Sequence, residues 1–459
     1  MMSDHFTTTI IACATPPGRG GVAVIRLSGP QAKDIATQLV KKNLPTRLAA
    51  CVTFFDSQGE AIDSGLALYF QGPASYTGED VVELHSHGSP TIVELIIQAA
   101  MHYGAEMAGP GAFTQRAFLH GKMDLFQAEA VASLIDAESA MAAKAAVRSL
   151  QGVFSEQVHA LVAALTQVRV QVEAGIDFSE EDIDHESQKA INQQIGRLLA
   201  DIQPLIVRTQ QGKKLSEGLR VVLAGPANAG KSTLYNYFTG EDDAIVTAEP
   251  GTTRDVLRQS VRLGASGVVI ELLDTAGIRD TEGMIEQIGI ARSKQHIADA
   301  DIVLLVLSAT TYREGDFERF INKSLNFSDL SGNICLVLNQ CDTVDAIESR
   351  ELAAHAMGFY ISAKTGQGIA ALVEALSAHC LGDLGASETT FIARARHVEA
   401  LRCAEVALQS ALRNSQDNGA VEIGAEHLRI AQDALGQITG EMTSDDLLGE
   451  IFGAFCIGK

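Results

Sequence analysis

Apolar and polar residues change their spacing three times along the chain, and the first stretch has the pattern of β-strands. Within residues 1–121, short apolar runs are separated by Gly and Pro clusters such as TPPGRGG and QGPASYTGED, which are typical of turns between strands. Helical spacing occurs at Gln31–Lys41 and Thr91–Met101. Residues 1–121 therefore predict an N-terminal α+β domain. Its expected strands are Thr9–Ala14, Val22–Leu27, Val52–Phe55, Leu66–Phe70 and Val81–His85.

From residue 122 the apolar residues follow a helical period. Val158, Leu161 and Leu165 recur at steps of three and four, as one buried face of a helix requires. After the acidic break DFSEEDID, a further helical pattern runs to residue 217, and helical spacing returns from residue 386. The pattern predicts one helical domain in two parts, 122–217 and 386–459.

Between these two parts, residues 218–385 alternate strands and helices. The apolar runs LRVVLAG, VVIELLD, DIVLLVL, ICLVLNQ and GFYISA are separated by helical or polar stretches. This alternation is typical of a mostly parallel sheet with helices on both faces. We therefore expect an α/β domain inserted into the helical domain.

The α/β segment contains a phosphate-binding motif. GPANAGKS, residues 225–232, fits G-x-x-x-x-G-K-[ST] and lies between a predicted strand and a predicted helix. Gly225 and Gly230 allow backbone N–H groups to surround phosphate oxygens, Lys231 reaches the β- and γ-phosphates, and Ser232 ligates Mg²⁺. The expected nucleotide-binding residues are Asn228, Ala229, Gly230, Lys231, Ser232 and Thr233.

Three further motifs follow, each at a predicted strand end. Asp274-Thr275-Ala276-Gly277 would lie at the metal and the γ-phosphate, whereas Asn339-Gln340-Cys341-Asp342 and Ser362-Ala363-Lys364 would bind the base. The Asp342 carboxylate can accept hydrogen bonds that guanine offers and adenine does not. Four ordered motifs predict a P-loop, Ras-like GTPase domain that binds GTP and GDP. The fold class is thus multidomain α/β plus α.

Two positions depart from the usual GTPase pattern. Gln340 stands where the base-binding motif normally has Lys, which indicates either tolerated drift or weaker nucleotide affinity, and we favour drift because Asp342 is present. Ile278 stands where Ras-like proteins carry the Gln that orients water. Arg254 is a weak candidate for an arginine finger. The polar stretch RDTEGMIEQIG supplies other candidates for the water-orienting role, Asp280, Glu282, Glu286 and Gln287.

Asn228, inside the phosphate loop, suggests a source of positive charge other than an arginine. Its side-chain oxygen could hold a monovalent cation beside the phosphates, or the residue could merely shape the loop. The spacing alone leaves both interpretations open.

Composition limits the possible partners and the location. The formal net charge of -22 argues against bulk electrostatic capture of nucleic acid, although a local basic patch or a partner that carries RNA remains compatible. Seven cysteines without a C-x-x-C pair suit reduced thiols. The N-terminus lacks a basic segment before its short apolar stretch, and no apolar run is long enough to span a bilayer. We expect a cytoplasmic protein.

The sequence ends in FCIGK, which raises three interpretations of Cys456. A prenylation box is disfavoured because Gly458 and Lys459 fill its last positions. The thiol could be inert or reactive, since a helix C-terminus disfavours a thiolate and Lys459 partly offsets that. The preceding apolar residues have helical spacing, with Thr443 or Ser444 as the N-cap: Leu447, Leu448, Ile451, Phe452 and Phe455.

Along its full length the chain resembles the MnmE (TrmE) family of bacterial tRNA modification GTPases. The resemblance rests on ATPPGRGG (14–21), YTGEDVVEL (76–84), GPGAFTQRAF (109–118), the GTPase motifs and TSDDLLGEIFGAFCIGK (443–459). It implies a homodimer formed through the N-terminal domain and a flavoprotein partner, MnmG (GidA). Together they would install an aminomethyl or carboxymethylaminomethyl group on C5 of the tRNA wobble uridine. The alternative is a ribosome-assembly GTPase, a switch without substrate chemistry. Such GTPases share the motifs but lack these termini, which favours the MnmE family.

The resemblance also implies residue roles. A 5-formyl- or 5,10-methylene-tetrahydrofolate would bind to Arg26, Glu83, Lys122 and Lys459, although Arg26 and Glu83 alone could equally form a surface ion pair. Glu286 would orient water, and Cys456 would belong to the modification site. Potassium would bind through Asn228, Thr247, Glu249 and Thr252, and Thr253 would join Ser232 on Mg²⁺. The whole segment is expected to bind the nucleotide and the cations: Thr247, Ala248, Glu249, Pro250, Gly251, Thr252 and Thr253.

Two N-terminal positions differ from the family pattern. Ala112 stands where Glu is usual, and His85 replaces a common Gln. His85 and His87 would point to one side of a strand. Without a third ligand nearby, the pair indicates a structural role rather than a zinc site.

Overall fold

The structure, a computed structural model, divides the chain into two compact units. One unit comprises Met1–Ile135, Ser149–Gln203 and Glu399–Lys459, and the other comprises Asp136–Arg148 and Pro204–Val398. The structure describes residues 7–137, 139–177, 185–226, 228–240, 258–263, 268–274, 300–312, 334–343, 357–384, 391–417, 419–441 and 445–458.

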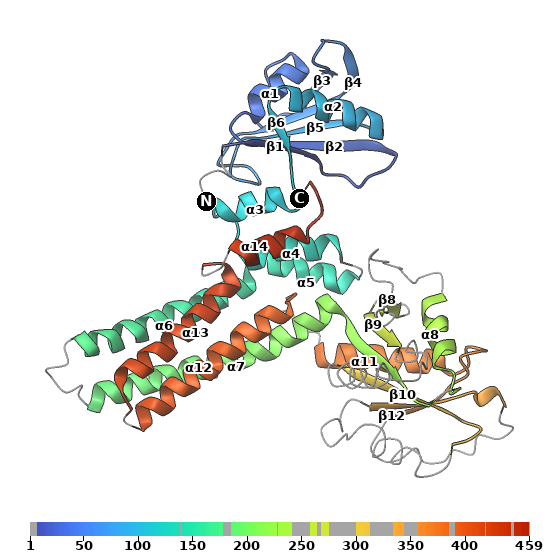
Figure 1. Ribbon diagram of the computed structural model, residues 1–459, viewed down its shortest axis with the longest axis vertical. Helices are drawn as coiled ribbons and strands as arrows, with labels where there is room; N and C mark the ends of the chain where they lie inside the picture. Colours follow the sequence, from blue (N-terminus) through green and yellow to red (C-terminus); the bar gives the residue numbers. More distant parts are fainter. Residues whose placement is uncertain are drawn as a thin grey trace, which may run out of the picture. The chain divides into compact units, whose positions relative to one another are not determined.

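The first unit begins with a six-stranded sheet in the order β3-β4-β5-β2-β1-β6 (Figure 1). Its neighbouring strands are antiparallel except for β1 and β6, which are parallel. Five strands match the predicted apolar runs. The strands are β1 (Thr9–Cys13), β2 (Gly20–Ser28), β3 (Ala50–Phe55), β4 (Ala61–Phe70), β5 (Val81–Gly88) and β6 (Ala105–Met107).

Two helices cover one face of this sheet, as the helical spacing predicts. They are α1 (Ala32–Val40) and α2 (Pro90–His102), and α2 has a proline at its first position, where no backbone N–H is needed. Between helices and sheet, buried side chains such as Ile11, Leu27 and Phe54 form the core. The opposite face of β2 and β5 carries the polar residues described below.

Two elements of this part do not follow from the apolar pattern. Strand β6 has only three residues and pairs with β1. Helix α3 (Ala112–Leu119) starts directly after Gly111, whose φ of 63° lies in the left-handed region. The sequence Gly109-Pro110-Gly111 interrupts the apolar pattern, so periodicity alone does not predict α3. The same three residues form the turn at which α3 begins.

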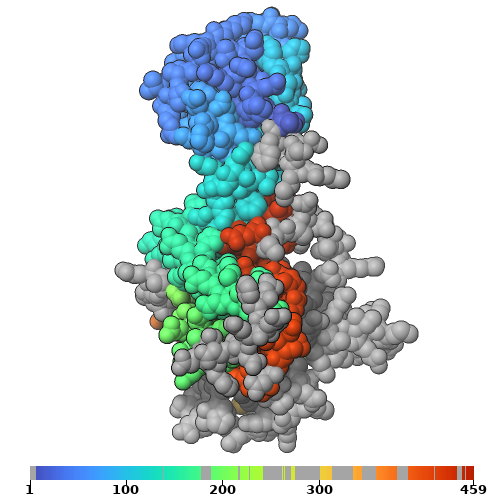
Figure 2. Space-filling view, turned by 90° about the vertical axis from the view of Figure 1, so that its left-hand side faces the viewer, coloured from blue at the N-terminus to red at the C-terminus, as the bar shows by residue number. Residues whose placement is uncertain are grey.

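Long helices complete the first unit, and they join segments from both ends of the chain. Helix α6 (Val153–Asp177) packs against α13 (Val421–Thr439), as Figure 1 shows. The C-terminal helix α14 (Asp445–Gly453) packs on α3 and α4, and Figure 2 shows its red surface against the cyan and teal residues that follow the sheet. The first unit also contains α4 (Leu125–Ile135), most of α12 (Ala395–Gln416) and the first part of α7 (His185–Glu217), whereas α5 (Ala140–Leu150) belongs mostly to the second unit.

The second unit contains a six-stranded sheet in the order β12-β11-β10-β7-β9-β8. All neighbours are parallel except β8, which is antiparallel to β9. This confirms the expected mostly parallel sheet. The strands are β7 (Leu219–Ala224), β8 (Arg258–Leu263), β9 (Val268–Asp274), β10 (Ile302–Ser308), β11 (Ile334–Asn339) and β12 (Met357–Tyr360).

Both faces of the second sheet are buried. Leu219, Val221 and Leu223 enter one apolar cluster with residues of α8 (Lys231–Gly240) and α11 (Ile369–Leu384). Their neighbours Val222 and Ala224 enter a separate cluster on the other face. Continuous apolar runs such as LRVVLA are what a sheet covered on both sides requires. The carboxyl ends of its parallel strands all meet at one edge, where the nucleotide motifs lie.

Candidate functional site

The turn from β7 into α8 requires glycine at two positions. Gly225 has a φ of 142°, and a Cβ there would lie 2.1 Å from the carbonyl oxygen of Val306. Gly230 has a φ of 87°, and its Cβ would lie 2.2 Å from Nδ2 of Asn339. Neither the space nor the backbone conformation admits a side chain. The loop therefore has the tight backbone cradle that the phosphate-binding motif predicts.

Lys231 is the first residue of α8 and its side chain closes back over the loop. It is buried, and its Nζ donates hydrogen bonds to the carbonyls of Gly225 and Pro226, both at 2.9 Å. Ser232 and Thr233 follow, exposed, in the first turn of the helix. The ammonium and the helix N-terminus thus place positive charge on the same loop, which favours an anion.

Asn339, at the end of β11, connects the phosphate loop with the motif Ser362-Ala363-Lys364. Its Nδ2 donates to the carbonyl of Ala229 at 3.0 Å, and its Oδ1 accepts from the backbone N–H of Ala363 at 2.9 Å. The Asn339 side chain is 2% exposed. An uncharged buried amide with both ends bonded is a rigid connector. The structure thereby brings Ala229, Asn339 and Ala363 together at one edge of the sheet.

The residues expected to bind the base lie at the same edge. Asp342 is exposed in a short 3-10 helix, Cys341–Thr343, and the N–H of Cys341 donates to the carbonyl of Ile361 at 3.1 Å. Ser362 is fully buried, whereas Lys364 is exposed. Burial, and next the charge of Asp342, raise the pKa of Cys341. Cys341 therefore serves packing, and Asp342 is the group free to face a ligand.

Several predicted residues fall outside what the structure describes. Asp274 ends β9, but its side chain is not among the described ones. The remaining positions outside the described ranges are Thr247, Ala248, Glu249, Pro250, Gly251, Thr252, Thr253, Arg254, Thr275, Ala276, Gly277, Ile278, Asp280, Glu282, Glu286, Gln287, Thr443, Ser444 and Lys459.

A second polar cluster lies on the face of the first sheet opposite α1 and α2. Arg26 on β2 is the register partner of Glu83 on β5, and its Nη2 donates to Oε1 of Glu83 at 2.8 Å. The Arg26 guanidinium also lies over the rings of Tyr76 and Phe113, at 5.4 and 5.7 Å from their centroids. Both members of the ion pair are one-fifth exposed. The aromatic rings hold the cation in place from one side and leave the carboxylate accessible.

The two histidines of the H-x-H pair have different surroundings. Nε2 of His85 is buried without a hydrogen-bond partner among the described residues, 3.6 Å from Oε2 of Glu83. His87 instead lies 2.8 Å, Nδ1 to Oδ1, from Asp63. Burial alone would raise the pKa of Asp63, but the hydrogen bonds from the His87 backbone and ring outweigh it and lower that pKa. In the part of the chain that the structure describes, no three His, Cys, Asp or Glu side chains gather closely enough for a metal.

The tail and Lys122 lie against the same domain. Lys122 is exposed and its Nζ donates to the carbonyl of Pro73 at 3.0 Å. Cys456 is exposed, and its carbonyl accepts a hydrogen bond from Gly111 at 3.4 Å, two residues before the Phe113 ring that contacts Arg26. Phe455, expected on the tail helix, lies beyond the end of α14 but is buried. The tail at Cys456 is therefore held against the turn that precedes α3.

Sequence reasoning missed a buried ion pair under this cluster. Arg116 on α3 donates from Nη1 to Oε2 of Glu79 at 2.9 Å, and the two side chains are 7% and 8% exposed. The same Nη1 donates to the carbonyl of Thr8, and Ser28 Oγ donates to Glu79 at 2.7 Å. Both residues lie inside the family segments, yet neither their pairing nor their burial has a local sequence signal. The pair fixes α3, and with it Phe113, against the sheet.

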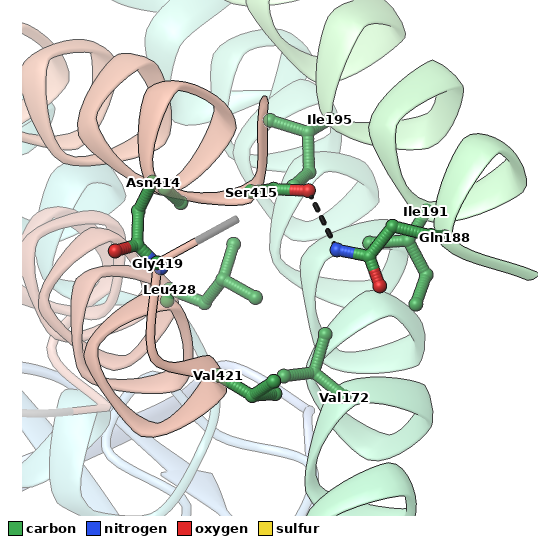
Figure 3. A pocket seen from close by; sticks show the side chains of 11 residues that line it. Val172, Gln188, Ile191, Ile195, Asn414, Ser415, Gly419, Val421 and Leu428 are labelled. Atoms are coloured by element: carbon green, nitrogen blue, oxygen red, sulfur yellow. Dashed lines mark hydrogen bonds between the residues drawn. The ribbon is translucent and has the colours of Figure 1, made fainter. Parts of the chain in front are cut away.

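A small hollow of about 30 Å³, open to solvent, lies elsewhere among the helices of the first unit (Figure 3). Its wall is mostly aliphatic, and Gln188 Nε2 donates across it to Ser415 Oγ at 2.8 Å. None of the predicted site residues lines it. The lining residues are Val172, Gln188, Ile191, Ile195, Ala411, Asn414, Ser415, Gly419, Val421, Gly424 and Leu428.

The loop between β7 and α8, with Asn339 and residues 362–364 beside it, defines a P-loop nucleotide-binding domain. Two family models match the chain: "GTP-binding protein TrmE N-terminus" over residues 9–122 and "MnmE helical domain" over 125–456. The chain therefore belongs to the MnmE family of tRNA modification GTPases.

Curated relatives and one solved structure extend this comparison. The tRNA modification GTPase MnmE of Stutzerimonas stutzeri (strain A1501) is 45% identical over 452 residues, 98% of this chain and 99% of its own. That of Dichelobacter nodosus (strain VCS1703A) is 46% identical over 454 residues, 98% of this chain and 99% of its own. The G domain of the T. maritima FeoB iron transporter is 25% identical with a TM-score of 0.27, covering 36% of this chain and 99% of that domain. Among the described helices, none has the length and apolar character to cross a membrane.

Proposed function

We propose that this chain hydrolyses GTP and that it acts in modifying the wobble uridine of tRNA. The observation that carries the proposal is the glycine cradle of residues 225–232, anchored by Asn339, in a chain that matches tRNA modification GTPases over nearly its full length. The domains serving this function are 1–121 for dimerisation and folate, 218–385 for GTP, and 122–217 with 386–459 as the helical frame.

The described residues fit a nucleotide. Without a Cβ at Gly225 and Gly230, the loop backbone packs directly against Val306 and Asn339, a close backbone turn whose N–H groups can serve phosphate oxygens. Lys231 exchanges its hydrogen bonds to the loop carbonyls for the β- and γ-phosphates, and Ser232, together with Thr253, holds Mg²⁺. Asp342 binds guanine, with Ser362, Ala363 and Lys364 beside it. The remaining assigned positions are Asn228, Ala229, Thr233, Asp274, Thr275, Ala276, Gly277 and Asn339.

We assign potassium to the phosphate loop because Asn228 places an exposed amide side chain in it. Asn228 is exposed and has a φ of 64°. This left-handed backbone conformation is less strained for glycine, yet the chain has Asn here. Its amide oxygen, with Thr247, Glu249 and Thr252, provides the oxygen ligands that a hard cation prefers. Glu286 orients the attacking water.

The Arg26–Glu83 cluster fits a folate. Arg26 uses only one oxygen of Glu83, so Oε2 remains for the N–H donors of a pterin, and the unpartnered Nε2 of His85 beside it offers a further polar contact. Lys122 and Lys459 suit the acidic tail of 5-formyl- or 5,10-methylene-tetrahydrofolate, the one-carbon source. Cys456, whose carbonyl accepts a hydrogen bond from Gly111 before α3, belongs to the modification site.

The protein acts as a homodimer with a flavoprotein partner, MnmG (GidA), in the cytoplasm. The net charge of -22 supports a division of labour in which the partner supplies most of the basic surface for tRNA. The product is a tRNA with an aminomethyl or carboxymethylaminomethyl group on C5 of the wobble uridine.

GTP turnover in potassium and in sodium chloride at equal ionic strength tests the nucleotide chemistry. We expect a rate at least about tenfold higher in potassium, and Asn228→Ala should remove the difference. Equal rates in both salts contradict the potassium assignment, whereas no hydrolysis in either salt contradicts the GTPase assignment itself.

A further inference from the structure

Gln340 bridges the end of β10 and the phosphate loop. Its Oε1 accepts a hydrogen bond from Ser308 Oγ at 2.5 Å, and its Nε2 donates to the carbonyl of Asn228 at 3.3 Å. A carbonyl can only accept, so this contact requires the amide nitrogen to face Asn228 and the amide oxygen to face Ser308. The side chain is therefore held at both ends in one orientation.

Together with Asn339, this amide holds three successive carbonyls of the phosphate loop. Asn339 Nδ2 lies 3.0 Å from the carbonyl oxygen of Ala229 and 3.5 Å from that of Gly230, and Gln340 takes the carbonyl of Asn228. In a trans peptide the C=O and the following N–H point in opposite directions. The N–H groups of Ala229, Gly230 and Lys231 must therefore point away from Asn339 and Gln340. Successive N–H groups aimed to one side form an anion-binding concavity.

The Asn228 contact holds a non-glycine residue in a left-handed conformation. Asn228 has a φ of 64°, which is sparsely populated for a residue with a side chain. The hydrogen bond from Gln340 fixes the peptide that follows this residue, and Ser308 fixes Gln340. The neutral side chain of Gln340 thus contacts the phosphate loop, whereas the base-binding motif of GTPases usually has a lysine at this position.

We propose that Gln340 is a positioning residue for the nucleotide's β-phosphate, and that Ser308 holds it in place. By binding the carbonyl of Asn228, Gln340 directs the N–H of Ala229 toward that phosphate. This inference rests on the proposed GTP site and deepens it. If Gln340 only covered the base, its loss would weaken every guanine nucleotide alike. If it acts through Ala229, its loss weakens nucleotides that have a β-phosphate.

Competition against a fluorescent GDP analogue on the full chain, with GDP and GMP as competitors, separates these roles. Gln340→Met keeps the length and the methylenes but has no donor, whereas Gln340→Lys restores a donor. We expect the Met variant to bind GDP about three- to tenfold more weakly, the effect of one hydrogen bond, while GMP affinity and the melting temperature stay unchanged. The Lys variant should bind GDP as the wild type does, and Ser308→Ala should lose about twofold.

Two outcomes overturn the inference. Equal losses for GDP and GMP in Gln340→Met assign the side chain to base coverage alone, and unchanged GDP affinity shows that the Asn228 carbonyl is held without it. Failure of the proposed function gives a different result, because the wild-type chain would then bind neither nucleotide before any variant is compared.

Discussion

Arg26 and Glu83 face each other across β2 and β5, and both Nε and Nη2 of the arginine donate to the same carboxylate oxygen, Oε1, at 3.0 and 2.8 Å. The second oxygen, Oε2, lies 3.6 Å from Nε2 of His85. The carboxylate is thus oriented by one cation while half of its accepting capacity stays available. This is the arrangement expected of a binding group rather than of a closed structural ion pair.

The first prediction concerns this carboxylate. Glu83→Gln should weaken binding of 5-formyltetrahydrofolate by about ten- to a hundredfold, because a hydrogen bond to a charged group contributes roughly 1.5–3 kcal/mol. The free energy of unfolding of the Glu83→Gln variant should differ from that of the wild type by less than about 1 kcal/mol, since the Arg26–Glu83 pair is partly exposed. Isothermal titration calorimetry measures the affinity. Asp63→Asn, which alters the other acidic group of this sheet that pairs with a histidine, is the control and should bind normally.

The second prediction concerns the buried pair of Arg116 and Glu79. Arg116→Met should destabilise the protein by about 3–5 kcal/mol, because it leaves an uncompensated carboxylate in the interior. The double variant Arg116→Met/Glu79→Gln should recover part of that loss. Urea unfolding measures both. A single variant that costs less than about 1 kcal/mol would show that Glu79 finds water or another donor.

The third prediction separates two glycines of the same unit. Gly230→Ala should abolish detectable nucleotide binding, because its Cβ would lie 2.2 Å from Asn339 Nδ2 at a φ of 87°. Gly240→Ala, at the end of α8, meets no atom of the described residues within 4 Å of the added Cβ and should bind as the wild type does. Fluorescent GDP titration distinguishes them. Equal affinities would show that the loop can rearrange around a side chain.

The fourth prediction concerns the thiols. Burial raises the pKa of Cys335 to about 12 from an ordinary value of 9.0, so its thiol should resist iodoacetamide at pH 8 while exposed Cys456 is alkylated. Mass spectrometry of samples taken over time measures the order in which Cys456 and Cys335 are alkylated. In the unfolded protein this difference between the two cysteines should disappear. A raised pKa favours the thiol in the folded state. The contribution of the protonated Cys335 thiol to the free energy of unfolding is therefore complete below about pH 9 and is lost as the pH rises toward 12. Rapid labelling of native Cys335 would contradict its burial.

Local patterns predict the parts of the fold that local chemistry decides. Short apolar runs between Gly and Pro clusters identify β1 to β5, and continuous apolar runs identify β7, β10 and β11 as strands covered on both faces. Strand β6 has too few residues for a period, and its identity depends on pairing with Ile10 and Ile11, almost 100 positions away. Such a pairing is a tertiary property that no window of sequence contains.

The same distinction applies to the candidate sites. Gly225, Gly230 and Lys231 are predictable because the phosphate motif constrains residues that are close in sequence. The hydrogen bond from Gln340 to Asn228 spans 112 positions, and the register that opposes Arg26 to Glu83 spans 57. Side-chain identity does not specify such partners, so only the resemblance to a family pointed to Arg26 and Glu83.

The most direct test of the proposed function is nucleoside analysis of tRNA from cells that lack this protein, complemented with the wild type, Lys231→Ala or Cys456→Ser. We predict that the C5 modification of the wobble uridine disappears, that the wild type restores it, and that neither variant does. Restoration by Cys456→Ser would reduce Cys456 to a packing role. Modification that persists in cells without the protein would contradict the account and would favour a GTPase switch without substrate chemistry.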